Sequence, residues 1–337
     1  MPSTDGIAFF TYGRGVAGRA TGRAVRLAAQ ASLTLPRGTI AVMLTLQWPS
    51  PRLPARVVVM GAGGFVGHAS ATQLASTGAP VVRLTRAEVD LLGPGGSAAL
   101  RSHLTPDTTL VVTSALAPVK NTSMLLDNLR MMQAVIEAVQ ASPVAHVIYI
   151  SSDAVYADSA GLLTEASSAE PASLHGVMHL AREVMLRNEL PGVPLACVRP
   201  TLIFGPGDPH NGYGPNRFMR LAQAGERIVL FGQGEERRDH IFIDDVAAIV
   251  TRCALHRATG IINAVTGVVT SFRTIAEMAA ARYSPPVPIV DTPRVGAMPH
   301  NGYRAFDASL LARVFPDLQL ATLAEGLDRV VAAAPRV

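Results

Sequence analysis

The sequence of 337 residues contains only two cysteines, one lysine and no long apolar run. Cys197 and Cys253 lack the spacing of a metal site, and sparse cysteines of this kind are typical of a reducing compartment. A membrane-spanning helix needs roughly 18–20 consecutive apolar residues, which are missing here. We therefore expect a cytoplasmic protein without a membrane partner, and its length suffices to bury a sizeable core.

Acidic residues are almost absent from the first 54 residues. This segment carries six arginines and one acid, Asp5, and its net charge of +5 exceeds the +4 of the whole chain. The rest of the chain is therefore close to neutral, and no nucleic-acid-binding surface is implied. An Arg-rich, acid-poor segment is typical of a targeting leader. We favour the alternative that 1–54 is a disordered extension or a start assigned too early, with Met43 as the true start.

Three glycines spaced three residues apart follow the apolar run 57–59. They are Gly61, Gly64 and Gly67. A buried strand that runs into such glycines and continues as a helix is typical of the phosphate-binding turn of a dinucleotide fold, although a glycine-rich loop is the alternative. Gly61 permits the tight turn, Gly64 lets the backbone approach a pyrophosphate, and Gly67 allows close packing of helix on strand.

Apolar runs and amphipathic segments alternate after this turn. Strands are predicted at 56–60, 80–84, 109–113 and 146–150, and helices at 69–76, 96–104, 125–139 and 174–189. Such alternation predicts an α/β fold with a Rossmann-type, doubly wound parallel sheet. Beyond Pro200 the pattern changes to Gly/Pro-rich loops, which indicate a smaller C-terminal substrate lobe. We expect the dinucleotide-binding domain at 55–200, with 237–265 returning to it, and the substrate lobe at 201–236 and 266–337.

Several short motifs follow in order along the chain. They are Ser-Ser-Asp-Ala-Val-Tyr at 151–156, Arg-Pro at 199–200, Gly-Pro-Gly-Asp at 205–208 and Arg-Asp-His-Ile-Phe-Ile-Asp-Asp at 238–245. Their order and spacing, from about Arg56 to the C-terminus, resemble those of the extended short-chain dehydrogenases/reductases of the NAD(P)-dependent epimerase/dehydratase family. The resemblance implies a nucleotide-sugar substrate, hydride transfer between a sugar carbon and nicotinamide, and a homodimer.

The catalytic helix departs from that family. Its members carry Tyr-x-x-x-Lys followed four residues later by Glu, whereas this chain has His175 and His179 before Glu183. The single lysine, Lys120, lies far upstream, so no shifted copy of the motif is present. Histidine has a pKa near 6.5 and acts as an acid or base without a neighbouring lysine.

Three interpretations of the histidine pair remain. In the first, His175 is the acid/base and His179 hydrogen-bonds the nicotinamide ribose. In the second, the site binds dinucleotide with little redox chemistry, which would suit a sensing or scaffolding protein. The third is a zinc site, for which Asp153 is the only evident third ligand; we expect no metal. Residues four apart share a helix face, so both imidazoles are expected to point into the cleft.

The resemblance also assigns substrate contacts. Ser152 stands where the family hydrogen-bonds the reacting sugar oxygen, and Asp153 follows where some dehydratases use an acid. Ala154 replaces the Glu of those enzymes, which favours epimerase or reductase over dehydratase. Arg238 matches the arginine that binds the nucleotide diphosphate, with a surface ion pair to Asp239 or Glu236 as the alternative. Leu202 replaces an Asn that contacts substrate in many relatives, and Tyr156 is expected to pack.

The cofactor preference depends on the end of the second predicted strand. NAD-binding folds place an acid there, roughly 20 residues past the glycines, but here Thr85 and Arg86 precede the first acid, Glu88. This Thr-Arg pair resembles the NADP-using GDP-fucose-synthase-like branch, although Arg86 could also be a solvated turn residue. We expect NADP as the favoured cofactor and NAD as the alternative. Besides the three glycines, the implied cofactor-binding residues are Phe65, Val66, Arg86, Asp90, Leu91, Ala115, Asn128 and His179.

Overall fold

The computed structural model describes residues 43–334 of the chain. A seven-stranded sheet has the order β1-β10-β6-β5-β4-β2-β3, and every neighbouring pair in it is parallel except β1 with β10. Its strands are β1 (Thr45–Leu46), β2 (Arg56–Met60), β3 (Val81–Leu84), β4 (Thr108–Val112), β5 (His146–Ile150), β6 (Leu195–Pro200) and β10 (Ala258–Ala264).

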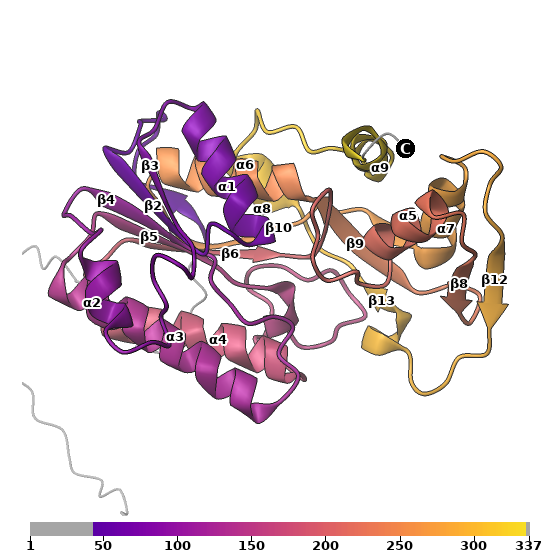
Figure 1. Cartoon of the computed structure of the whole chain (residues 1–337), viewed down its shortest axis with the longest axis horizontal. Coiled ribbons are helices and arrows are strands. Elements are labelled where there is room, and N and C mark those ends of the chain that lie inside the picture. The colour runs from indigo at the N-terminus through magenta and orange to yellow at the C-terminus, as the bar shows by residue number, and fades with distance from the viewer. Residues whose placement is uncertain (1–42, 335–337) are drawn as a thin grey trace, which may run out of the picture. The chain divides into compact units, whose positions relative to one another are not determined.

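Helices cover both faces of this sheet (Figure 1). On one face α1 (Phe65–Ser76) and α6 (Ile243–Leu255) pack over alternate strand residues such as Val57 and Val59. On the other face α2 (Gly96–Arg101), α3 (Thr122–Ala141) and α4 (Leu174–Glu189) pack over Val58 and Met60. The strands are apolar along their whole length because both of their faces are buried.

The predicted fold class is confirmed. All four predicted strands and all four predicted helices are present, and their bounds differ only at the ends. The first helix begins at Phe65, directly after the glycine turn, because Gly64 already has the extended backbone of an N-cap. Helix α2 ends early at Arg101, and α3 extends from Thr122 to Ala141 with Asn121 as its N-cap.

A smaller lobe follows β6 and lies to the right in Figure 1. Strands β7 (Leu202–Phe204), β9 (Arg237–Phe242), β11 (Val269–Ser271) and β13 (Tyr303–Arg304) form one sheet, and β8 (Ile228–Phe231) pairs with β12 (Ile289–Thr292). Helices α5 (Pro215–Gln223), α7 (Phe272–Ala280) and α9 (Leu323–Ala333) complete its aromatic core. Helix α8 (Ser309–Val314) instead packs onto the first core through Leu310 and Leu311.

The predicted N-terminal extension ends earlier than residue 54. Leu44 is buried, β1 pairs with β10, and the backbone N–H groups of Trp48 and Arg52 donate to carbonyls that follow α6 or end it. Residues 43–54 are therefore part of the fold, and the expectation for 1–42 lies outside the described residues. Across 43–334, no helix is both long and apolar enough to cross a bilayer.

Candidate functional site

A cavity of about 380 Å³ lies at the carboxyl ends of β2, β3 and β4. Six of the predicted cofactor residues line it: Gly61, Gly64, Arg86, Asp90, Leu91 and Ala115. Sequence reasoning missed other wall residues, among them Leu92, Ser114, Leu116 and Met131. The strand-end position is where open α/β sheets bind ligands.

The geometry of the glycine turn fits a pyrophosphate. Gly61 has a φ of +94°, and a Cβ on Gly67 would lie only 2.1 Å from the Gly61 carbonyl oxygen, so both positions require glycine. At Gly64 the nearest atom to a Cβ is 3.4 Å away, which leaves open space before the first turn of α1. That turn contains no acid, and its unpaired N–H groups suit an anion.

Phe65 and Val66 begin α1 and do not line the cavity. Their side chains pack partly buried against the core of the smaller lobe. Any contribution of these two residues to cofactor binding is therefore through their backbone N–H groups.

The prediction that Asn128 binds the cofactor directly is wrong. Its side chain is fully buried, accepts from the N–H of Leu116 at 3.0 Å, and donates to the carbonyls of Leu116 and Met124. The amide is thereby fully occupied. Asn128 holds the loop after β4, whose residues Ala115 and Leu116 line the cavity.

The cavity wall after β3 carries one basic and one acidic side chain, Arg86 and Asp90, and Glu88 lies between them in the sequence. Arg86, with a side chain 76% exposed, pairs with Asp90 at 3.2 Å. The Glu88 carboxylate folds back and accepts from the N–H of Thr85 at 2.8 Å, and this hydrogen bonding, mainly from the Thr85 hydroxyl, lowers the pKa of Glu88. Arg86 is therefore free to reorient toward a ligand but has an acid partner of its own.

His175 lies on the first turn of α4, against the short helix η1 (Asp153–Val155). A Cβ on Gly176 would lie 2.0 Å from the Ala154 carbonyl oxygen, which explains the glycine at this contact. His175 is half-buried, and its Nδ1 is buried without a hydrogen-bond partner in the described part of the chain. Burial lowers the pKa of His175 from its ordinary 6.5, while Asp153 opposes that shift.

The structure differs from expectation at His179. Its side chain is buried rather than directed into an open cleft, and its Nδ1 lies 2.8 Å from the Tyr149 hydroxyl on β5. Burial lowers the pKa of His179 well below 6.5, and His175 and Arg182 lower it further. The two imidazole rings meet edge to face with centroids 4.7 Å apart. His179 is therefore a neutral group whose ring packs against that of His175.

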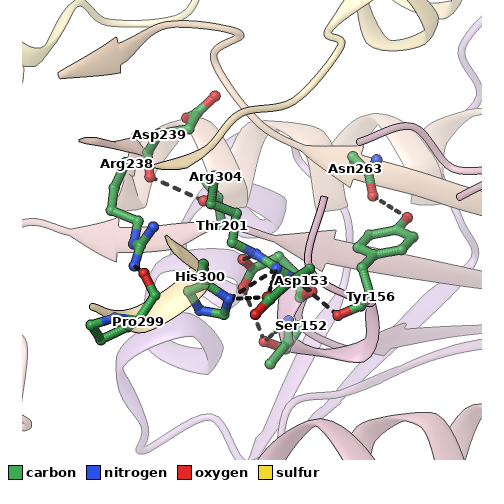
Figure 2. A network of polar contacts seen from close by, with 12 residues as sticks. Ser152, Asp153, Tyr156, Thr201, Arg238, Asp239, Asn263, Pro299, His300 and Arg304 are labelled. Atoms are coloured by element: carbon green, nitrogen blue, oxygen red, sulfur yellow. Dashed lines mark hydrogen bonds and ion pairs between the residues drawn. The ribbon is translucent and has the colours of Figure 1, made fainter. Parts of the chain in front are cut away.

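A network of polar contacts surrounds Asp153 (Figure 2). Arg304 from β13 donates through Nε to the Asp153 carboxylate at 2.9 Å and through NH1 to Asp158 at 3.1 Å. His300 also contacts Asp158. Sequence reasoning missed Arg304, because no motif links it to a residue 151 positions earlier.

Arg238 is buried and its guanidinium is partly occupied. It pairs with Glu236, one of the two partners named in the alternative interpretation, but the pair is buried and not at the surface. It also donates to the Pro299 carbonyl at 2.8 Å (Figure 2). Glu236 also lies 3.6 Å from Arg294. A phosphate at Arg238 would therefore compete with Glu236.

The remaining predicted residues have clear surroundings. Ser152 is half-buried, and its Oγ accepts from the Ala154 N–H at 3.1 Å as the cap of η1. Tyr156 packs as expected: it is buried, donates to Asn263 at 2.6 Å and lies beneath the Arg199 guanidinium.

Within residues 43–334, no three His, Cys, Asp or Glu side chains are grouped to hold a metal, so the zinc alternative lacks its ligand set.

Comparison with known proteins identifies the family. Residues 57–265 match the model of the NAD dependent epimerase/dehydratase family. The chain belongs to this family. It is 30% identical over 203 residues to a UDP-glucose 4-epimerase of Mycolicibacterium smegmatis, covering 58% of this chain and 64% of that protein. It is 35% identical over 128 residues to a dTDP-L-rhamnose 4-epimerase of Burkholderia thailandensis, covering 36% and 35%. The match thus spans less than two thirds of either relative.

Solved structures of the family share the fold. A UDP-glucose 4-epimerase of Thermotoga maritima with UDP-glucose superposes with a TM-score of 0.74 at 19% identity, covering 82% of this chain and 97% of that one. A GDP-L-fucose synthetase of Naegleria fowleri bound to NADP gives 0.73 at 16% identity, covering 84% and 94%. The fold of this chain, a parallel α/β sheet with a smaller C-terminal lobe, is therefore the fold of these structures.

The glycine turn yields a first prediction. We expect Gly64→Val to lower dinucleotide affinity by at least about tenfold, because its side chain would occupy the space of the pyrophosphate. The melting temperature should stay near that of the unmodified protein, since the position is open in the fold. Gly67→Val is the matched contrast, because it collides with the turn itself and should destabilise the protein. Unchanged affinity of Gly64→Val in calorimetry would contradict the assignment of the cavity.

Proposed function

We propose that the chain is an NAD(P)-dependent epimerase or reductase of a nucleotide-linked sugar, with His175 as its acid/base. The observation that carries this proposal is the half-buried His175 imidazole, which the charge of Asp153 influences, on the same helix as Arg182, whose guanidinium donates to Ser114 in the cavity wall. Position 154 is an alanine and not an acid, which favours an epimerase or reductase over a dehydratase.

The protonation state of His175 determines whether it first accepts a proton from the sugar or donates one to it. Because its pKa is lowered, the ring is neutral near pH 7 and accepts the proton of a sugar hydroxyl. The nearby Asp153 carboxylate then stabilises the imidazolium, and the Ser152 hydroxyl orients the same oxygen. When bound, the nicotinamide supplies the hydride acceptor for the carbon that bears this hydroxyl. The reverse step returns the proton from His175.

The phosphates and base of the substrate have chemically suited partners in the smaller lobe. Arg238 carries a buried guanidinium that fits a diphosphate if Glu236 yields to it. Glu236 also contacts Arg294, which in turn donates to the carbonyl of Phe231. The Phe231 ring is half exposed and packs against Tyr213, which offers an aromatic surface for a base. Leu202 is exposed and offers no polar contact.

A catalytically degenerate dinucleotide-binding protein is the second candidate. Two observations favour it: the Asp153 carboxylate is already held by Arg304, and the His179 ring contacts the Tyr149 hydroxyl. Binding of dinucleotide without turnover of any UDP-, dTDP- or GDP-sugar would select this alternative.

The His175 assignment predicts a pH profile and a rate loss. The rate of sugar oxidation should be constant above an apparent pKa lower than 6.5 and fall as pH decreases through it, because only the neutral ring accepts a proton. His175→Ala should lower the rate on the order of 10²–10⁴-fold while dinucleotide affinity is retained. His103→Ala, in the connection between α2 and β4, is the control and should leave both the rate and the dinucleotide affinity unchanged. A His175→Ala protein with full activity would exclude this residue as the acid/base.

The cofactor preference yields a further prediction. We expect NADP to bind more tightly than NAD, because the exposed Arg86 guanidinium is able to leave Asp90 and pair with a 2′-phosphate. Arg86→Ala should reduce this difference several-fold, measured by titration calorimetry. Arg83→Ala, an exposed neighbour on β3 that does not line the cavity, should leave it unchanged. Equal affinities of the unmodified protein for NAD and NADP would make Arg86 a turn residue only.

The proposed setting is a cytoplasmic homodimer without nucleic-acid or membrane partners. Cys197 and Cys253 are buried and unpaired, as suits a reducing compartment. An apolar stripe on α4, formed by Leu174, Val177 and Val184, is exposed, and Leu126 on the adjacent α3 is exposed as well. A second copy would cover this face. Sedimentation velocity should give twice the chain mass, and Val184→Glu should return the monomer; a monomeric unmodified protein would contradict this.

A further inference from the structure

Arg182 on α4 is one of the most deeply buried charged side chains of the described structure, with 1% of its surface exposed. Its Nε and NH2 donate to the Asn128 carbonyl at 2.9 and 2.8 Å, and its NH1 donates to the Ser114 carbonyl at 2.8 Å. The guanidinium thus joins α4 to the start of the loop after β4 and to α3. All of these partners are neutral carbonyl groups.

No acidic side chain among residues 43–334 lies within ion-pair distance of Arg182. The next residue in the chain, Glu183, is held by Arg199 and Ser151 instead. Arginine remains protonated in proteins, so a full positive charge is buried here without an anion. Burying a charge in this way is costly unless it has a partner, and a purely packing role would not require a charge.

The position of this charge relates it to the cavity. Ser114, whose carbonyl accepts from Arg182, lines the cavity together with Ala115 and Leu116. His179 lies one helical turn before Arg182 on α4. The guanidinium therefore lies behind the cavity wall, on the side of the wall that faces the His175–His179 pair.

The other groups at this place are uncharged. Burial lowers the pKa of His179 and raises the pKa of Tyr149 well above 10, so both are neutral near pH 7. In the proposed reaction, proton and hydride leave adjacent atoms of the sugar, so the nicotinamide must lie close to His175. Of the charged side chains near the His175–His179 pair, Asp153 is paired with Arg304 and Glu183 with Arg199, which leaves Arg182 as the charge without an anion.

We propose that Arg182 makes the bound dinucleotide a stronger hydride acceptor by favouring its reduced form. The oxidised nicotinamide ring carries one positive charge and the reduced ring carries none, so a fixed cation behind the wall disfavours only the oxidised form. The phosphates are the same in both forms, and their attraction to Arg182 cancels in the comparison. This inference rests on the proposed function, because it takes the nicotinamide to lie beside His175.

The test measures the dissociation constants of NADP⁺ and NADPH, and of NAD⁺ and NADH, in the absence of sugar. The intact protein should bind the reduced form at least about tenfold more tightly than the oxidised form. A difference of this size is expected from one charge interaction inside a protein. Arg182→Gln retains donors for the carbonyls and should lower this ratio about tenfold, mainly by tighter binding of the oxidised form. A tenfold change corresponds to about 30 mV for a two-electron couple.

Three controls separate charge from packing. Arg182→Lys keeps the charge and should keep the ratio. Arg187→Gln removes a more exposed charge from the same helix and should also keep it. ADP-ribose 2′-phosphate lacks the nicotinamide, so the change in its affinity between the intact protein and Arg182→Gln measures only the effect on the phosphates, which NADP⁺ and NADPH share.

The outcomes are distinct. Tight binding of both forms with the same ratio in Arg182→Gln and the intact protein would overturn the inference and leave the dinucleotide site standing. Failure of the intact protein to bind any of the four dinucleotides would overturn the proposed function together with it. If Arg182→Gln does not fold, as judged by circular dichroism, the ratio of the intact protein decides: equal affinity for NADP⁺ and NADPH overturns the inference.

Discussion

The buried ion pair between Glu183 and Arg199 fixes the orientation of helix α4. Arg199 on β6 donates to both carboxylate oxygens of Glu183, at 2.8 and 2.6 Å, and Ser151 at the end of β5 donates to one of them at 2.6 Å. Bidentate geometry with a third donor is what allows such a pair to remain buried. The rotation of α4 about its axis is thereby set from the centre of the sheet. His175 consequently faces η1, and Arg182 faces the loop after β4.

Most of the fold could be predicted from the sequence because its main strands are buried on both faces. Apolar runs such as 57–59 identify these strands, and the glycine turn identifies the one connection where the backbone must approach a ligand. The edge strand β1 was missed, because two residues give no periodicity. Its place in the sheet depends on pairing with β10, more than 200 residues later.

The candidate site was predicted less completely, because its polar groups take partners from distant segments. Helical spacing places His175 and His179 on one face, but it does not reveal that His179 contacts the Tyr149 hydroxyl. A motif position suggested ligand contact for Asn128, yet its amide is hydrogen-bonded to Leu116 in the loop after β4 and to Met124 on α3. Arg304 and Asp153 meet only because β13 returns beside η1. Pairings of this kind are tertiary and leave no local pattern in the sequence.

The buried charge of Arg182 also limits which side chains position 179 accepts. A lysine at position 179 would bring a second cation next to Arg182, whose charge already lowers the pKa of His179. The two histidines and the buried arginine therefore form a coupled set, and substitutions at these three positions are not expected to act additively on stability.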